Sequence, residues 1–164
     1  IVGIREYLNE LDTNLSILDS SIRTGNSMAD AILNSKVSLA KAREIDVRVD
    51  AHIPVKLKIS EIDLCCILGN LFDNAIDASM ALPPQNRLIR VYMDMKGSRL
   101  YISFTNFTSQ KKLGKLGRVF ATTKGLGHGL GLSRIENIVE KHDGYLSFNS
   151  EDGAFTAEIL LPQE

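Results

Sequence analysis

Apolar residues recur at intervals of three and four in the N-terminal part of the chain, which is the spacing of one helix face. The first run predicts a helix over residues 4–23 and consists of Leu8, Leu11, Leu15, Leu18 and Ile22. Residues 24–27, Thr-Gly-Asn-Ser, interrupt this pattern, and a second apolar run predicts another helix that ends near residue 43. We expect these helices to form a short N-terminal helical appendage, which divides the chain into residues 1–43 and residues 44–164.

The remaining pattern alternates helices with antiparallel strands. The expected elements are a strand and loop over residues 45–59, a long helix from Ser60 to about residue 82, strands over 88–95 and 99–106, a helix from about Gly129 to His142, and strands over 144–150 and 154–161. Ser60 can cap the long helix, with Asp63 approximating the acid of a capping box. Because short turns at Lys96-Gly97 and Asp152-Gly153 join consecutive strands, the chain is predicted to be an α+β fold, a two-layer α/β sandwich.

The composition narrows the possible functions. A chain of 164 residues that is 44% hydrophobic can bury the core of one compact domain. Its formal net charge of -1 argues against a general nucleic-acid-binding surface, which would carry a basic surplus. No run of about 18 apolar residues occurs, so we expect no membrane contact. The thiols, Cys65 and Cys66, are helix neighbours that suit a reducing, cytoplasmic setting better than a disulfide.

The long helix has one polar face made of short side chains. Projected at about 100° per residue, Asn70, Asp73, Asn74 and Asp77 fall in one sector, and the apolar residues lie opposite. An ordinary solvated face is the simplest explanation, but such faces usually carry Lys and Glu, which favour helices more than Asn and Asp do. Short amides and carboxylates can instead coordinate Mg²⁺ together with phosphate oxygens. The face is therefore a candidate metal and phosphate site.

A glycine-rich segment precedes the helix that is expected from residue 129. It reads Gly125-Leu126-Gly127-His128-Gly129-Leu130-Gly131-Leu132. Closely spaced glycines let the backbone approach a bulky anion, and a helix start supplies unpaired amides and a partial positive charge. Residues 107–124 before it contain no acid and five cations, Lys111, Lys112, Lys115, Arg118 and Lys124. This asymmetry favours a lid over a polyphosphate, with a flexible turn and a solvated loop as the alternatives.

Two motifs resemble those of one ATP-binding superfamily. Asn70-Leu71-Phe72-Asp73-Asn74-Ala75 resembles the asparagine box of GHKL proteins (gyrase, Hsp90, histidine kinases and MutL), and residues 125–132 resemble the second glycine box of the kinases. The resemblance implies a Bergerat-type ATP-binding fold with ATP and Mg²⁺ as cofactors and Asn74 as the metal ligand. ATP-hydrolysing members have a glutamate where this chain has Asn70, and an amide cannot act as a general base. Asn70 and Asn74 are the implied catalytic residues of an enzyme that keeps the γ-phosphate for transfer.

The usual Asp-x-Gly-x-Gly box of the superfamily is absent after the strand that ends near residue 106. Asn106 is the best substitute, because its carbonyl oxygen can accept a hydrogen bond from an adenine amino group, although a strand-ending turn residue is an equal alternative. His128 could contact phosphate or serve only as a loop residue. The implied nucleotide-contacting set is Asn70, Asp73, Asn74, Asp77, Asn106, Lys124, Gly125, Gly127, His128, Gly129, Leu130 and Gly131. The missing box, with Thr24-Gly25-Asn26 and Ile32-Leu33-Asn34-x-Lys36, resembles the peptide-sensing quorum kinases of the accessory gene regulator type.

The resemblance also implies partners. Kinases of this class phosphorylate a histidine on a dimerising helical hairpin, and the histidines of this chain, His52, His128 and His142, are absent from the first two predicted helices. We expect the acceptor histidine to precede Ile1 in a longer, homodimeric, membrane-bound receptor, with a response regulator downstream. The alternative is that this chain phosphorylates a histidine of another molecule. Two alternatives remain: a non-catalytic binding module with a degenerate pocket, and an ATPase of the gyrase or Hsp90 branch, which Asn70 disfavours.

Overall fold

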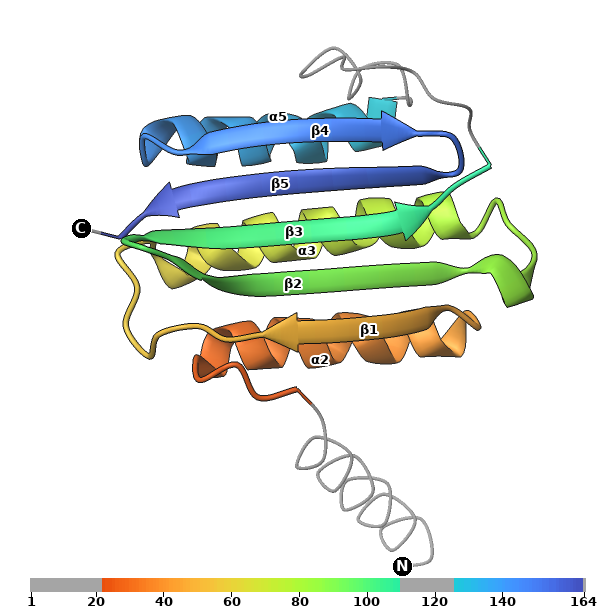
Figure 1. The fold of residues 1–164 in the computed structure, drawn as a ribbon, viewed down its shortest axis with the longest axis horizontal. Helices are drawn as coiled ribbons and strands as arrows, with labels where there is room; N and C mark the ends of the chain where they lie inside the picture. The colour runs from red at the N-terminus through yellow and green to blue at the C-terminus, as the bar shows by residue number, and fades with distance from the viewer. Residues whose placement is uncertain (1–21, 110–125, 164) are drawn as a thin grey trace, which may run out of the picture.

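A mixed β-sheet forms one layer of the molecule and α-helices cover one of its faces (Figure 1). The computed structural model describes residues 22–109 and 126–163, with residues 126–130 described by their backbone. Its elements are α2 (Ser27–Ala42), β1 (Asp46–Ala51), α3 (Glu61–Ser79), the 3-10 helix η1 (Pro84–Asn86), β2 (Leu88–Lys96), β3 (Arg99–Phe107), α5 (Leu126–Lys141), β4 (Tyr145–Glu151) and β5 (Ala154–Pro162). The predicted α+β two-layer sandwich is confirmed.

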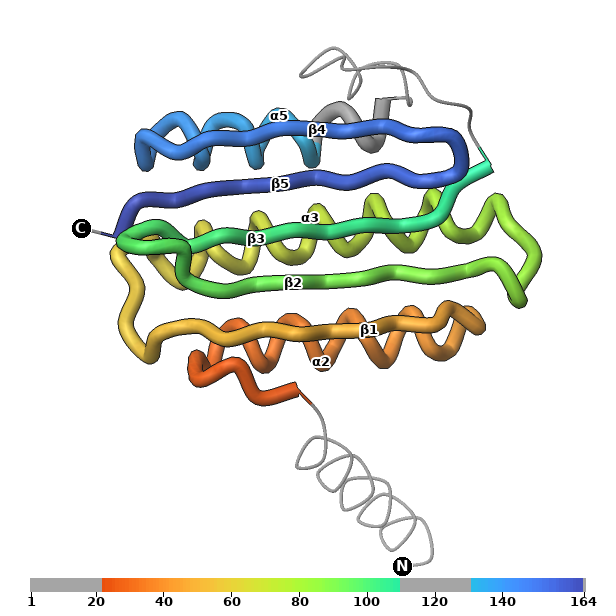
Figure 2. Tube along the Cα trace, viewed as in Figure 1, coloured from red at the N-terminus to blue at the C-terminus, as the bar shows by residue number. Residues whose placement is uncertain are grey.

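The sheet has the strand order β1-β2-β3-β5-β4. β1 pairs with β2 in parallel, and the other neighbours are antiparallel, as two hairpins require. Gly97 and Gly153 have φ angles of 63° and 82°, so the residue that most easily adopts the left-handed region stands in both hairpin turns. The tube in Figure 2 shows that β3 and α3 run in the same direction, one behind the other.

The core lies between the sheet and the helices. Alternate residues of β3, Leu100, Ile102 and Phe104, are buried beneath the helical layer. Phe104 meets Phe72 of α3 edge-on, with ring centroids 5.3 Å apart. Burying such aromatic and aliphatic side chains contributes about 1.5–3 kcal/mol each, so this contact fixes α3 over the centre of the sheet.

Helix α2 belongs to the same core, which corrects the division after residue 43. Ala29, Leu33 and Ala40 are completely buried, and α2 packs beside α3 and behind β1 (Figure 1). The apolar period of a helix shows that one face is buried but not against what, so the sequence did not distinguish an appendage from a third core helix. Ile22 and Arg23 lie outside any helix, and the rest of the first predicted helix lies outside the described residues.

The ends of two helices show where sequence rules succeed and where packing overrides them. Ser60 caps α3, since its Oγ atom accepts from the backbone nitrogen of Asp63 at 3.1 Å, as expected. Helix α5 begins at Leu126 rather than near Gly129, so part of the glycine-rich segment is helical. Glycine is a poor helix former and the sequence therefore favoured a loop, but local propensity is a weak guide beside tertiary packing.

The described helices include none that is both long enough and apolar enough to cross a lipid bilayer.

Candidate functional site

We call the side of α3 that carries Asn70 and Asn74 the asparagine face, and it contacts the glycine-rich start of α5 at Asn70 and Gly131. Asn70 donates from Nδ2 to the carbonyl oxygen of Cys66, 2.8 Å away and one turn earlier, which fixes the orientation of its amide. Its Oδ1 atom lies against α5, because a Cβ atom built on Gly131 would come within 2.8 Å of that oxygen. Gly131 thus leaves the space that the Asn70 amide occupies. Asn70 and Gly131, 61 positions apart in the sequence, are neighbours in the fold.

Asn74 lies one helical turn after Asn70, on the same side of α3. Its side chain is partly buried, and its amide nitrogen is completely buried. Burial of the nitrogen end restricts the rotation of the amide. A restricted side chain of this kind is preorganised to present an oxygen to a cation.

The two carboxylates of the polar face do not share this environment. Asp73 and Asp77 are both exposed. Asp73 lies toward α2, where its Oδ1 atom is 2.7 Å from the Lys36 ammonium. The structure therefore places Asn70 on the α5 side of α3 and Asp73 on the α2 side.

Asn106 lies on the helix-facing side of β3 and is only 4% exposed. Its Nδ2 atom donates to the carbonyl oxygen of Phe107 at 3.1 Å. It is two residues beyond Phe104 on the same face of β3, and Phe104 contacts Phe72 of α3. Asn106 is paired within β3, with Ile89 on one side and Phe155 on the other, so it is a strand residue rather than the strand-ending turn residue of the alternative. Its role as a hydrogen-bond acceptor for adenine stays a prediction.

Comparison with known proteins assigns this arrangement to a family. Residues 59–162, more than half of the chain, match the GHKL domain family. The chain belongs to this family. GHKL domains bind ATP, so family membership supports ATP as a ligand of this chain.

Two curated relatives of this GHKL domain are kinases. Sporulation kinase C of Bacillus subtilis (strain 168) is 30% identical over 122 residues, which cover 68% of this chain and 28% of that protein. The sensor histidine kinase ZraS of Escherichia coli (strain K12) is 33% identical over 128 residues, which cover 75% of this chain and 27% of that protein. The chain thus spans little more than a quarter of the length of these relatives.

The fold of the GHKL domain also occurs in the solved structure of the catalytic domain of histidine kinase ThkA. The two superpose with a TM-score of 0.67 at 18% sequence identity, covering 86% of this chain and 93% of that one. At this identity the likeness establishes the fold, and it agrees with the sandwich described above.

Part of the predicted nucleotide-contacting set is described only partly or not at all. The backbones of Gly127, His128, Gly129 and Leu130 form the first turns of α5. Lys124 and Gly125, with the cations of the predicted lid, lie outside the described residues. Their roles remain predictions.

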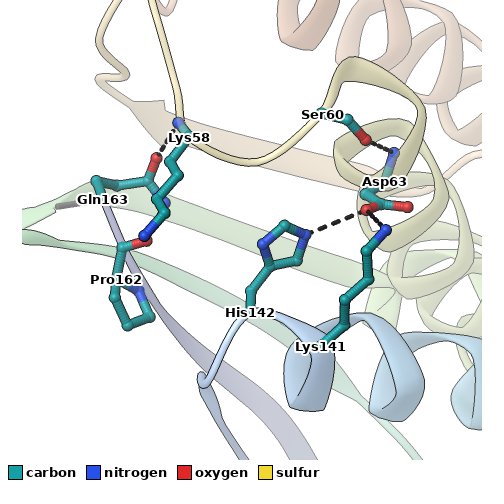
Figure 3. Close-up of polar contacts among 7 residues, drawn as sticks. All are labelled: Lys58, Ser60, Asp63, Lys141, His142, Pro162 and Gln163. Carbon is teal, nitrogen blue, oxygen red and sulfur yellow. Dashed lines mark hydrogen bonds and ion pairs between the residues drawn. The ribbon is translucent and has the colours of Figure 1, made fainter.

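The opposite end of the α3–α5 pair carries a polar cluster that the sequence did not reveal (Figure 3). Asp63 of α3 accepts from the Lys141 ammonium at 3.0 Å and lies 3.1 Å from Nε2 of His142. Hydrogen bonds from His142 and then Lys141 hold the pKa of the Asp63 carboxyl below its usual value. From the sequence, Asp63 is predicted only as part of a capping box. Its partners Lys141 and His142 lie 78 and 79 positions later in the chain, and no local sequence pattern predicts such a contact.

Cys65 and Cys66, which are adjacent in α3, are free cysteines and both are partly buried. Burial, together with the charge of Glu61, raises the pKa of the Cys65 thiol, so this thiol stays protonated and unreactive near neutral pH.

Two cavities lie away from the asparagine face. One, of about 520 Å³, lies between α2 and β1, and the other, of about 450 Å³, lies beside the end of α5 and the start of β4. Neither is lined by Asn70 or Asn74, so neither is the predicted nucleotide site.

Proposed function

We propose that this chain is the catalytic ATP-binding domain of a bacterial sensor histidine kinase, which transfers the γ-phosphate of Mg-ATP to a histidine outside residues 1–164. The observation that carries this proposal is the close approach of Asn70 to Gly131. It places an amide-bearing helix face against the glycine-rich start of another helix, and each is suited to one part of a metal-bound polyphosphate.

The residues present fit magnesium and ATP. The side-chain oxygen of Asn74 is a hard ligand of the kind that Mg²⁺ accepts, and its amide is held by burial. Gly131 leaves the space that the Asn70 amide occupies, and the first backbone amides of α5 would point toward an anion bound at that helix start. A bound Mg²⁺ would neutralise phosphate charge. Asn106 would accept from the adenine amino group.

Asn70 supports transfer rather than hydrolysis. A carboxylate at this position could take a proton from water, but an amide cannot. Here the Asn70 amide nitrogen is already committed to the Cys66 carbonyl oxygen, so the side chain serves to position groups beside α5. We expect slow phosphate release from ATP when no acceptor is present, which a phosphate-release assay measures.

The decisive experiment is nucleotide titration of the Asn74→Ala variant. Isothermal titration calorimetry with a non-hydrolysable ATP analogue should show binding to the unaltered chain with Mg²⁺, and loss of the magnesium-dependent part in the variant. Asn137→Ala, which removes an exposed asparagine of α5, is the matched control and should bind as the unaltered chain does. Global unfolding of Asn74→Ala would show that the residue is structural.

The proposal extends to partners that lie outside this chain. The acceptor histidine would belong to a dimerising helical region of the same protein, and a response regulator would receive the phosphate. A cytoplasmic position in a membrane-bound receptor, and the narrower likeness to accessory-gene-regulator quorum kinases through Thr24-Gly25-Asn26 and Asn34-x-Lys36, belong to the same proposal.

A second candidate function is a non-catalytic binding module. It is favoured by the presence of an amide, Asn106, where the superfamily usually has an adenine-binding aspartate. Titration separates the two, because a degenerate module should show no binding of the ATP analogue at millimolar concentration.

A further inference from the structure

Polar side chains of α2 form hydrogen bonds with the residues that precede this helix. Asn34, 7% exposed on α2, accepts from the backbone nitrogen of Ile22 and donates to the carbonyl oxygen of Ile22, each at 3.1 Å. Both backbone groups of Ile22 are therefore bound by one side chain. These two hydrogen bonds hold the entering chain against the middle of α2.

The next residues are fixed in the same way. Asp30 of α2 accepts from the backbone nitrogen and the hydroxyl of Thr24, at 2.7 and 2.6 Å. The carbonyl oxygen of Thr24 accepts from the backbone nitrogen of Ile53 at 2.8 Å. Gly25 has a φ of 102°, and a Cβ atom there would lie 2.7 Å from the Ile53 carbonyl oxygen, so the backbone admits glycine alone without strain.

Asn26 completes the attachment. Its side-chain oxygen caps α2 by accepting from the backbone nitrogen of Ala29 at 3.1 Å. Its Nδ2 atom donates to the carbonyl oxygens of Pro54 and Val55, at 3.4 and 3.3 Å. We call residues 22–26 the joint. Because the joint is bonded both to α2 and to the segment after β1, displacement of the entering chain must displace α2 or break these bonds.

Lys36 connects α2 to the asparagine face of α3. Its Cε atom lies 3.9 Å from where a Cβ atom on Gly69 would stand, and its ammonium is 2.7 Å from Oδ1 of Asp73. The Lys36 side chain therefore lies along one turn of α3, from Gly69 to Asp73, and this turn contains Asn70. Its ammonium pairs with Asp73, the residue before Asn74.

We propose that Lys36 is a positioning residue for the nucleotide site, which holds α2, and with it the joint, against the turn of α3 that carries Asn70. The inference rests on the proposed function. Lys36 holds the Asp73 carboxylate toward α2 and neutralises it, so that this charge does not oppose the phosphates bound beside Asn74. Each polar residue of the Thr-Gly-Asn and Asn-x-Lys motifs thereby has a role in one connected path.

Electrostatics sets the direction of the effect. Without Lys36, an unneutralised carboxylate would stand next to the proposed metal ligand and repel a polyphosphate, and this repulsion would decrease as the salt concentration rises. Asp73 is 50% exposed and Lys36 is 21% exposed, so the loss should be moderate and sensitive to ionic strength. A purely structural role for Lys36 would not depend on salt in this way.

The test compares four chains by calorimetric titration with the Mg²⁺-ATP analogue at low and at high salt. Lys36→Met keeps the aliphatic stem over Gly69 and should weaken binding about threefold to fivefold at low salt, and less at high salt. Lys36→Met combined with Asp73→Asn removes the charge that Lys36 neutralised and should bind more tightly than Lys36→Met does at low salt. Lys41→Met, an exposed lysine in the last turn of α2, is the matched control and should bind as the unaltered chain does.

The outcomes separate this inference from the proposed function. If the unaltered chain binds no nucleotide, the proposed function fails and this inference fails with it. If the unaltered chain binds but Lys36→Met binds equally well, or if the double variant stays as weak as Lys36→Met, the positioning role of Lys36 is wrong and the proposed function stands. Urea unfolding of all four chains shows whether any loss reflects unfolding.

Discussion

The two ends of the helical layer are built from different interactions. At one end, which we call the anchored end, α2 and α3 begin and α5 ends. Hydrogen bonds there join residues distant in sequence: Asn26 to Pro54, and, in Figure 3, Asp63 to His142 and Lys58 to Gln163. The other part, which we call the nucleotide half after the proposed site, carries Asn70, Asn74 and Asn106, and Asn70 lies against Gly131 of α5. Ion pairs and helix caps hold the elements together at the anchored end, whereas asparagine side chains and Gly131 line the nucleotide half.

This difference matters because a ligand site needs fixed walls and open space at once. The anchored end sets the spacing and tilt of α3 and α5 without occupying the nucleotide half. Mutations in the two regions should therefore have opposite signatures: loss of stability at the anchored end, and loss of nucleotide affinity with little loss of stability in the nucleotide half. Each variant below tests that separation.

The largest stability effect is expected at Gly144, in the turn that follows α5. Its nitrogen donates to the Val139 carbonyl oxygen at 2.8 Å, and a Cβ atom on it would lie 2.6 Å from the Leu160 carbonyl oxygen. Since the obstacle is backbone, Gly144→Ala must shift the end of α5 away from β5 and should lower the free energy of unfolding by about 1–3 kcal/mol. Urea denaturation measures the change.

Gly69→Ala is the matched control for Gly144→Ala. Gly69 is inside α3, and a Cβ atom there meets its nearest neighbours at 3.9 Å, which is ordinary contact. Alanine favours a helix over glycine by about 0.8–1.0 kcal/mol, so this variant should gain stability. Equal losses for both variants would mean that close approach to β5 does not hold α5.

In the nucleotide half, Gly131→Ala should impair binding more than folding. The new Cβ atom would lie 2.8 Å from Oδ1 of Asn70, and the end of a side chain can move where backbone cannot. We expect affinity for the Mg²⁺-ATP analogue to fall about tenfold, equivalent to about 1.4 kcal/mol, while the free energy of unfolding changes by less than about 1 kcal/mol. Unchanged affinity in a folded variant would show that the position of Asn70 is unimportant for the nucleotide.

The sequence predicted the local features and missed the contacts between distant segments. The cap of α3 at Ser60, both hairpin turns, and the common face of Asn70 and Asn74 follow from periods and turn residues that act over a few positions. The burial of α2 depends on which helix packs beside it, and the pairing of Asp63 with His142 joins residues 79 positions apart. No short-range pattern encodes such contacts. The assignment to the GHKL family is confirmed, because two motifs at the right spacing are more specific together than either motif alone.

The smallest effect is expected from Asp63→Asn at the anchored end. The pKa of Asp63 is lowered in the folded chain, so its ionised form contributes stability above the unfolded value near 3.8, and this contribution is lost as the pH falls through the folded pKa. Asp63→Asn should therefore be less stable than the unaltered chain by up to about 1 kcal/mol at pH 6. The difference should shrink as the pH is lowered toward 3. Asp46→Asn removes an exposed carboxylate paired with Arg48 at 3.4 Å and should show almost no difference at either pH. Urea denaturation at both pH values gives the comparison, and a gap for Asp63→Asn that stays constant from pH 6 to 3 would show that the charge on Asp63 does not hold α5 to α3.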